Sequence, residues 1–149
     1  MAKFVYRMQN ILELKQKMET QEKMAFGIAN AKLHEEQDKL QELLLRRAGY
    51  DNELKEASCG NIDLQRIQQI KRAIDSIKVK IRDQMFAIRR AQKELDMARM
   101  RLDAVMKDRK THENLREHAL DEFKEEAARQ ENKEIDELVS FTYGSEHKH

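Results

Sequence analysis

The most informative property of the sequence is what it lacks. Its 149 residues contain no proline and only four glycines, whereas average usage would give about seven prolines. Tryptophan is absent, and aromatic residues together make up 5% of the chain. A compact core needs more large apolar side chains than this, but a pair of long helices needs only a narrow apolar stripe. The composition therefore disfavours a globular domain and favours long helices.

Paired cysteines and long apolar runs are missing too. Cys59 is the only cysteine, so the chain cannot form an internal disulfide, which fits a reducing compartment. Apolar runs such as residues 43–45 are far shorter than the roughly 20 residues of a membrane-spanning helix. Polar residues also follow the start too early for a signal peptide. We therefore expect a cytoplasmic protein that is soluble or, at most, peripheral to a membrane.

Charged residues make up 38% of the chain but leave a net charge of only +1, so the total charge suggests no partner. Their distribution is uneven. Residues 61–110 hold 14 basic and 7 acidic side chains, whereas residues 111–149 hold 5 basic and 11 acidic ones. An ordinary solvated helix surface explains this pattern as well as a binding function does, and both interpretations stay open.

One segment interrupts the helical pattern. Gly60 suits the left-handed conformation that ends a helix, and Asp63 suits the position that caps the next one. The sequence therefore predicts two helices within a single domain. The expected bounds are about 3–58 and 63–140 for the helices, 58–63 for the turn, 142–149 for a frayed tail, and 1–149 for the domain.

The second predicted helix carries a heptad repeat, which is typical of a left-handed coiled coil. One apolar series recurs every seven residues, and a companion series has one polar member, Gln84. The first series is Ile67, Ile74, Ile81, Ile88, Leu95 and Leu102, and its companions are Ile70, Ile77, Ala91, Ala98 and Val105. A weaker continuation runs through Ala119, Phe123, Ala127, Ile135 and Leu138.

The first predicted helix has a less regular repeat that slips by one residue near Gly27, which predicts a heptad discontinuity there. Its members are Phe4, Ile11, Met18 and Ala25 before the slip, and Leu33, Leu40, Arg47 and Leu54 after it.

A short turn between two such helices forces them to pack antiparallel. The predicted fold class is all-α, with two long helices in an antiparallel coiled-coil hairpin whose second helix is the longer. Folding at Gly60 pairs residues whose numbers add up to about 121. The second helix then has no partner beyond about residue 117, and an unpaired apolar stripe there would mark a binding surface.

No catalytic constellation is recognisable in the sequence. His112 and Glu113 begin like a zinc-protease helix, but Arg116 stands where the second histidine ligand belongs. Arg89 and Arg90 could suggest nucleic acid, yet no aromatic residues interleave the basic ones. We therefore expect no enzyme, no catalytic residue, no metal, no cofactor, no small-molecule substrate and no nucleic-acid partner. Most of the eight methionines, which lie largely at or beside the repeat, would fill the interface between the helices.

Four segments resemble the flagellar FliJ family. They are residues 3–15 (KFVYRMQNILELK), 22–27 (EKMAFG), 105–113 (VMKDRKTHE) and 133–138 (KEIDEL). The resemblance implies an antiparallel coiled coil, similar in shape to the central stalk subunit of rotary ATPases, that serves type III flagellar export. It implies docking in the export ATPase hexamer, contact with the transmembrane export gate, and binding of export chaperones. The expected location is the cytoplasmic side of the cell membrane at the flagellar base.

The resemblance suggests two candidate sites. The chain termini would enter the ATPase, and the half of the hairpin near the turn would contact the gate. The candidate ATPase-binding residues are Phe4, Tyr6, Arg7, Arg116, Phe123, Ile135 and Leu138. The candidate gate-binding residues are Leu43, Arg47, Tyr50, Leu54, Ile70 and Ile74, although most of these would also suit the interface between the helices. The alternative function is that of a structural coiled coil that forms homo-oligomers.

Overall fold

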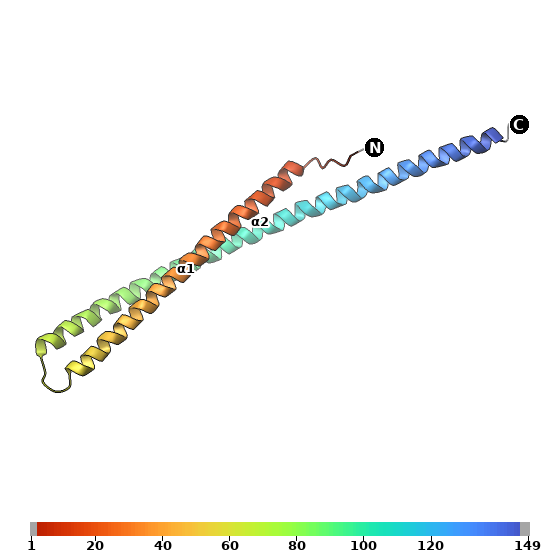
Figure 1. Cartoon of the computed structure of the whole chain (residues 1–149). Helices are drawn as coiled ribbons and strands as arrows, with labels where there is room; N and C mark the ends of the chain where they lie inside the picture. Colours follow the sequence, from red (N-terminus) through yellow and green to blue (C-terminus); the bar gives the residue numbers. More distant parts are fainter. Residues whose placement is uncertain (1–2, 147–149) are drawn as a thin grey trace. The chain divides into compact units, whose positions relative to one another are not determined.

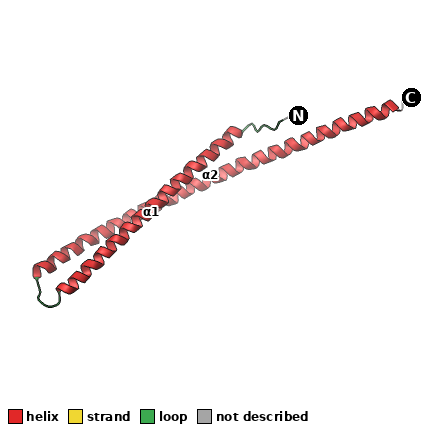
Figure 2. Ribbon diagram, viewed as in Figure 1, coloured by secondary structure: helices red, strands yellow, loops and turns green. Residues whose placement is uncertain are grey.

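The computed structural model describes residues 3–146, which form two long helices and no strand (Figures 1 and 2). Helix α1 covers Gln9–Ala57 with 49 residues, and helix α2 covers Leu64–Glu146 with 83 residues. The helices pack against each other in opposite chain directions. The predicted all-α antiparallel hairpin with a longer second helix is confirmed.

The contacts divide the chain into two compact units, which we describe separately. The terminal unit comprises residues 1–20 and 104–149, and the turn unit comprises residues 21–103. Each unit contains a segment of α1 and a segment of α2. A single domain over the whole chain stays a prediction.

The turn between the helices has the predicted local chemistry. Gly60 adopts a φ of 76°, the left-handed conformation that glycine reaches without a steric penalty. The Asp63 carboxylate accepts hydrogen bonds from the backbone N–H groups of Gln65, at 3.0 Å, and Arg66, at 3.4 Å. These bonds satisfy donors that the first turn of α2 leaves without helical partners. Both assignments made from the sequence are confirmed.

The interface of the turn unit contains the heptad series predicted for α2. Two apolar clusters are formed, each with side chains from both helices. One cluster consists of Leu33, Ala91 and Leu95, with Phe26, Ala29 and Ile88 packed against it. The other consists of Ala57, Ile70 and Ile74, with Tyr50, Leu54 and Ile67. Leu54 and Ile67 fall in one cluster, and Leu33 and Ile88 in the other. The residue numbers of each pair add up to 121, so the pairing expected from a fold at Gly60 is confirmed for them.

The polar exception in the α2 series, Gln84, finds a partner on α1. Its side-chain amide donates hydrogen bonds to the backbone carbonyl and to the carboxylate of Glu36. Glu36 is itself buried, with only 7% of its surface exposed. Lys32 and Lys39 of the same helix also pair with the Glu36 carboxylate. A shift of the helices would therefore leave the Gln84 amide without its partners on α1, so this contact favours one alignment of the two helices.

The predicted slip near Gly27 is wrong. Buried and half-buried positions in α1 recur every seven residues without interruption, in one series that includes Leu12, Glu19, Phe26 and Leu33. Ile11, which the sequence placed in the interface, is 40% exposed, whereas Leu12 is 3% exposed. Glu19 and Arg47 are the charged members of this series. Because Glu19 interrupts the apolar pattern, the apolar residues Ile11 and Met18 beside the series predicted a different one.

The helix ends also differ from the expected bounds. Helix α1 begins at Gln9 rather than near residue 3, after a turn in which the Gln9 N–H bonds to the carbonyl of Tyr6 at 3.1 Å. The aromatic and β-branched run of residues 4–6 has low helix propensity. Helix α2 continues past residue 140 to Glu146, since no proline or capping group stops it earlier. The rest of the expected frayed tail lies outside the described residues.

Candidate partner-binding surfaces

An aromatic contact holds the N-terminal stretch of the terminal unit against α2. The rings of Phe4 and Phe123 lie 5.6 Å apart and are tilted by 57°. The guanidinium of Arg116 stacks 5.6 Å from the centre of the Phe4 ring and donates a hydrogen bond from Nε to the side chain of Gln9 at 3.1 Å. Phe4 therefore contacts two other candidate ATPase-binding residues, Arg116 and Phe123.

The other two candidates from the N-terminal stretch differ from each other. Arg7 is exposed, whereas Tyr6 is half-buried. The hydroxyl of Tyr6 is buried and has no hydrogen-bond partner within the part of the chain that the structure describes. A buried hydroxyl without a partner costs free energy, so Tyr6 does not owe its position to hydrogen bonding in this unit.

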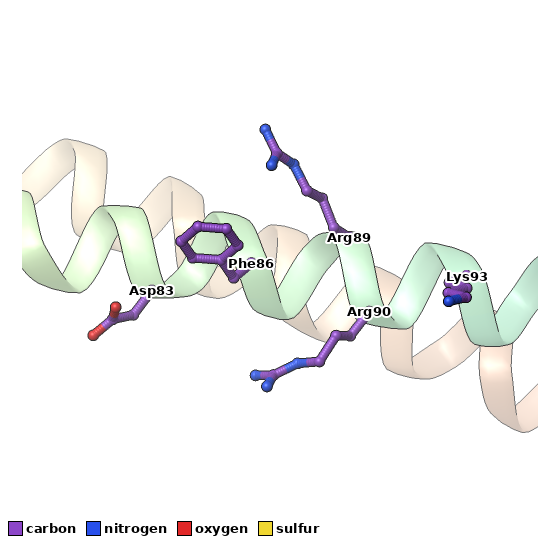
Figure 3. A pocket seen from close by; sticks show the side chains of 5 residues that line it. All are labelled: Asp83, Phe86, Arg89, Arg90 and Lys93. Carbon is purple, nitrogen blue, oxygen red and sulfur yellow. The ribbon is translucent and has the colours of Figure 1, made fainter.

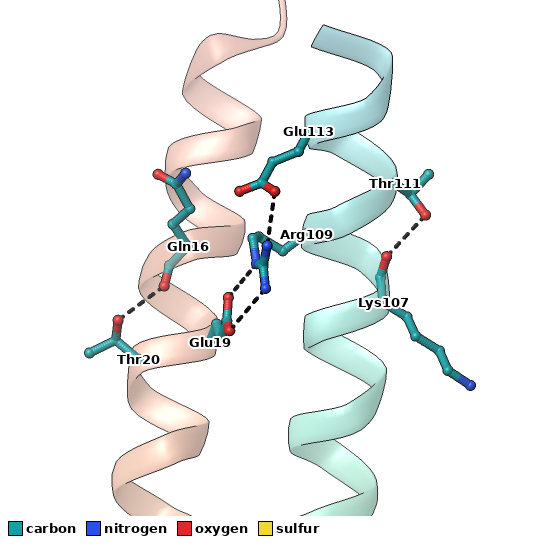
Figure 4. Close-up of polar contacts among 7 residues, drawn as sticks. All are labelled: Gln16, Glu19, Thr20, Lys107, Arg109, Thr111 and Glu113. Atoms are coloured by element: carbon teal, nitrogen blue, oxygen red, sulfur yellow. Dashed lines mark hydrogen bonds and ion pairs between the residues drawn. The ribbon is translucent and has the colours of Figure 1, made fainter. Parts of the chain in front are cut away.

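Ion pairs between charged side chains, called the ladder below, connect α1 to α2 in the terminal unit. Figure 4 shows the part of the ladder around Arg109. Arg109 donates from Nε to the Glu19 carboxylate at 2.6 Å, and a second nitrogen reaches the Glu113 carboxylate at 2.9 Å. Lys15 pairs with Asp108 at 2.7 Å. Hydrogen bonding to Glu19 raises the pKa of Arg109, and hydrogen bonding to Lys15 lowers the pKa of Asp108. Bidentate and charge-assisted contacts of this type are directional, so they align the helices as well as attract them.

The sequence prediction missed this ladder, although a signal for it exists. Arg109 and Arg116 continue the seven-residue spacing of the α2 series beyond Leu102, and Glu19 occupies the equivalent position on α1. A repeat defined only by apolar residues passes over such positions. An apolar repeat therefore does not reveal ion pairs that form between the two helices at their interface.

The unpaired part of α2 begins later than expected. Ala119, Leu120 and Phe123 are half-buried, and every described side chain from residue 124 to 144 is exposed. The expected start near residue 117 is therefore wrong. The N-terminal stretch is not helical, and an irregular chain advances more than the 1.5 Å per residue of a helix, so Phe4 reaches further along α2 than a helical residue would.

The exposed part of α2 carries large apolar side chains. The candidates Ile135 and Leu138 are 56% and 66% exposed. Val139 and Phe141 are also exposed, and the sequence prediction did not include them. Ile135, Leu138 and Val139 follow the spacing of a single helix face. This face, together with Phe141, is called the terminal stripe below.

The candidate gate-binding residues lie in the turn unit, where they form part of the interface between the helices. Tyr50, Leu54, Ile70 and Ile74 share one apolar cluster. Ile70 and Ile74 are buried at 6% and 7% exposure, whereas Leu43, Arg47, Tyr50 and Leu54 are half-buried. Only these four present surface that another molecule could contact, and the two isoleucines pack in the same cluster as Tyr50 and Leu54.

Within residues 3–146, neither helix contains a stretch long and apolar enough to cross a membrane. The same residues contain no group of three or more His, Cys, Asp or Glu side chains placed to hold a metal ion. His112 lies beside Asp108, with 3.7 Å between Nε2 and the nearest carboxylate oxygen.

Comparisons with known proteins give a family and a fold. The family model described as flagellar FliJ protein matches residues 4–148. A solved structure from Chlamydia trachomatis, described as a YscO homologue, superposes with a TM-score of 0.69 at 21% identity, covering 98% of this chain and 99% of that one. At this identity the likeness shows the fold alone. No curated protein matches significantly. Because the family match spans nearly the whole sequence, the chain belongs to the FliJ family and is a component of flagellar type III export.

Proposed function

We propose that the chain acts by binding partners within the flagellar export machinery, not by catalysing a reaction, and that it does so through two separate surfaces. The terminal unit docks in the hexameric export ATPase, in the manner of a stalk. The turn unit contacts the transmembrane export gate, and export chaperones bind the same protein. These partners are bound on the cytoplasmic side of the membrane.

The observation that carries the proposal is the exposed terminal stripe. Soluble helices rarely expose several large apolar side chains along one stretch unless another molecule covers them. Every side chain from residue 124 to 144 is exposed. Four of them are large and apolar, and Ile135, Leu138, Val139 and Phe141 are each more than half exposed. A socket in a partner protein would bury these side chains and remove the cost of their exposure.

Charge around the terminal stripe supports a specific partner. Residues 124–144 hold six acidic and three basic side chains. Arg129 approaches Glu125 and Glu126 only loosely, at 3.8 and 3.9 Å. Exposed contacts of that length contribute little to stability, so the carboxylates remain available. A socket with an apolar floor and a basic rim would complement this segment.

The proposed gate-contacting surface consists of Leu43, Arg47, Tyr50 and Leu54. Tyrosine and arginine are enriched among residues that dominate binding energy, and both are half-buried here, which holds them in place while leaving surface free. Ile70 and Ile74 would act indirectly, by packing beneath Tyr50.

Substitution of the terminal stripe tests the ATPase assignment. We expect Ile135→Ser combined with Leu138→Ser to weaken binding to the purified export ATPase hexamer at least roughly tenfold, because two exposed apolar anchors are lost. Binding is measured by titration calorimetry with the full-length chain. Leu45→Ser is the matched control, since Leu45 is an equally exposed leucine in the turn unit, at 73%.

Two results would contradict this assignment. Equal affinity of the double variant and the native chain would show that the terminal stripe does not contact the ATPase. If sedimentation showed that the native chain self-associates with rising concentration, and the double variant stayed monomeric, the stripe would instead support the homo-oligomeric alternative.

A further inference from the structure

We propose that the outer face of α2 in the turn unit is a docking site for an acidic amphipathic helix of a partner protein. The proposal does not depend on the ATPase or gate assignments. The face points away from the buried series of α2, reaches the edge of the α1 interface at Arg90 and Met97, and is called the basic face below. It consists of Val79, Arg82, Phe86, Arg89, Arg90, Lys93, Met97 and Met100.

Helical periodicity places these residues on one side of α2. Positions 79, 86, 93 and 100 are separated by seven residues and lie nearly above one another, and positions 82, 90 and 97 fall between them. The buried residues Ile77, Ile81 and Leu95 belong to the opposite side, against α1. The basic face is thus left uncovered by the hairpin itself.

The apolar members of the basic face are exposed to solvent. Phe86 is 51% exposed, and Val79, Met97 and Met100 are exposed to a similar or greater degree. Phe86 is the only aromatic residue on this face. Aromatic residues, methionine and arginine are the residue types enriched at protein interfaces, and methionine adapts its shape to a range of apolar partners.

Cations surround Phe86 without being neutralised. The guanidinium of Arg89 lies 5.6 Å from the centre of the Phe86 ring. Figure 3 shows the side chains of Arg89 and Arg90 diverging from neighbouring positions, one upward and one downward in the view, with Phe86 one turn away towards Asp83. Within residues 3–146, Arg89, Arg90 and Lys93 make no ion pair, and Asp83 is the one carboxylate that lines their depression.

The positive charge continues across to α1. A second depression shares Asp83 and Arg90 with the first and is also lined by Lys39, Arg46 and Lys80, against one further carboxylate, Glu42. Lys39 is engaged with Glu35 and Glu36, but Arg46 and Lys80 make no ion pair with any described residue. The two depressions together present six cations and two carboxylates, which favours an anionic occupant.

The mixture of side chains favours a protein over other anions. Nucleic acid would use the cations but would leave Val79, Met97 and Met100 in water, and one aromatic residue does not form a stacking platform. A lipid surface would need an apolar face separate from the cations, whereas here they alternate. A helix with a leucine stripe bordered by glutamates would cover the apolar side chains and neutralise the cations together.

The test uses a synthetic helical peptide with leucine at the first and fourth heptad positions, glutamate at the fifth and seventh positions that border them, and alanine elsewhere, labelled for fluorescence anisotropy. We expect it to bind the full-length chain, and to bind the Arg90→Glu variant at least roughly tenfold more weakly, because like charges then face each other. Phe86→Ala should weaken binding as well. Arg66→Glu is the matched control, since it makes the same charge change at an exposed position in the first turn of α2.

Each other outcome overturns the proposal. The site is wrong if the peptide does not bind the native chain, or if Arg90→Glu and Phe86→Ala bind it like the native chain while circular dichroism shows unchanged helicity. The partner class is wrong if a peptide with lysine in place of glutamate binds equally well. It is also wrong if single-stranded oligonucleotide or phosphatidylglycerol vesicles bind more tightly and with the same dependence on Arg90.

Discussion

At the scale of single residues, charged side chains in this hairpin occupy interface positions that apolar side chains fill in a simpler coiled coil. Glu19 is 7% exposed and accepts from Arg109. A buried carboxylate is tolerated only when it is paired, because loss of the partner would leave its charge without compensation. Such contacts contribute more to the alignment of the helices than to the free energy of unfolding.

The ion pair between Asp108 and Lys15 makes stability depend on pH. Lys15 lowers the pKa of Asp108, so the stabilisation is present above the pKa of the unfolded chain, about 3.9, and is lost as the pH falls through the lower pKa of the folded state. Asp108→Asn should therefore lower the Tm at pH 7 and leave it unchanged at strongly acidic pH, as followed by circular dichroism.

The control for that measurement is Asp121→Asn. Asp121 is an exposed residue of α2 that makes no ion pair with any described residue. The Tm of the Asp121→Asn variant should equal that of the native chain from strongly acidic pH to pH 7. A Tm difference between Asp108→Asn and the native chain that stays constant down to strongly acidic pH would contradict the role given to the ion pair.

The residues of the turn could be predicted from the sequence, whereas the charged residues of the interface were missed. Gly60 and Asp63 were predictable because a left-handed turn and a helix cap each require particular residue types. Glu19, Glu36 and Arg109 were missed, because a charged residue at an interface position resembles a charged residue in solvent, and the seven-residue spacing was the one signal that marked Glu19 and Arg109. Their partners lie far away in the sequence and become evident only when the helices are aligned.

At the scale of helices, the two segments differ in how strongly their sequences specify the interface. The isoleucine-rich series of α2 predicted its buried side without error in the turn unit. In α1, Leu12 and Leu33 are members of one uninterrupted series, but polar members such as Glu19 hid it and Ile11 suggested another. The partner helix, not the local pattern, decides which side of α1 is buried.

Glycine substitutions separate helix propensity from turn conformation. An added Cβ at Gly49 or at Gly60 would meet no atom within 4 Å, so backbone conformation alone decides the outcome. Gly49→Ala in α1 should raise the free energy of unfolding by up to about 1 kcal/mol. Gly60→Ala should lower it by about 1–2 kcal/mol, because alanine is strained at a φ of 76°.

Urea denaturation followed by circular dichroism measures both changes, and each variant serves as the other's control for the added methyl group. A neutral or stabilising effect of Gly60→Ala would show that the turn adopts another conformation in solution. A loss of stability in Gly49→Ala would show that the position is packed against something not seen in this structure.

At the scale of the whole molecule, the fold was more predictable than the sites. Composition, one turn and a seven-residue repeat suffice for two antiparallel helices, because few other structures accommodate them. The sites depend on exposure, which the sequence does not give. Ile70 and Ile135 look alike in the sequence, yet the first is buried and the second is 56% exposed.

We propose two partners for two surfaces of one chain, the terminal stripe for the export ATPase and the exposed residues near the turn for the export gate. These surfaces belong to different units and share no residue, and sites without shared partners respond to substitution almost independently. Changes in one surface should therefore leave binding at the other intact.

The most direct measurement is the affinity of the native chain and two variants for both the ATPase hexamer and the soluble part of the export gate. Ile135→Ser with Leu138→Ser should lose ATPase binding and keep gate binding. Arg47→Ala with Tyr50→Ala, at unchanged helicity, should lose gate binding and keep ATPase binding. Equal effects of either variant on both partners, or no effect on either partner, would contradict the assignment of separate surfaces.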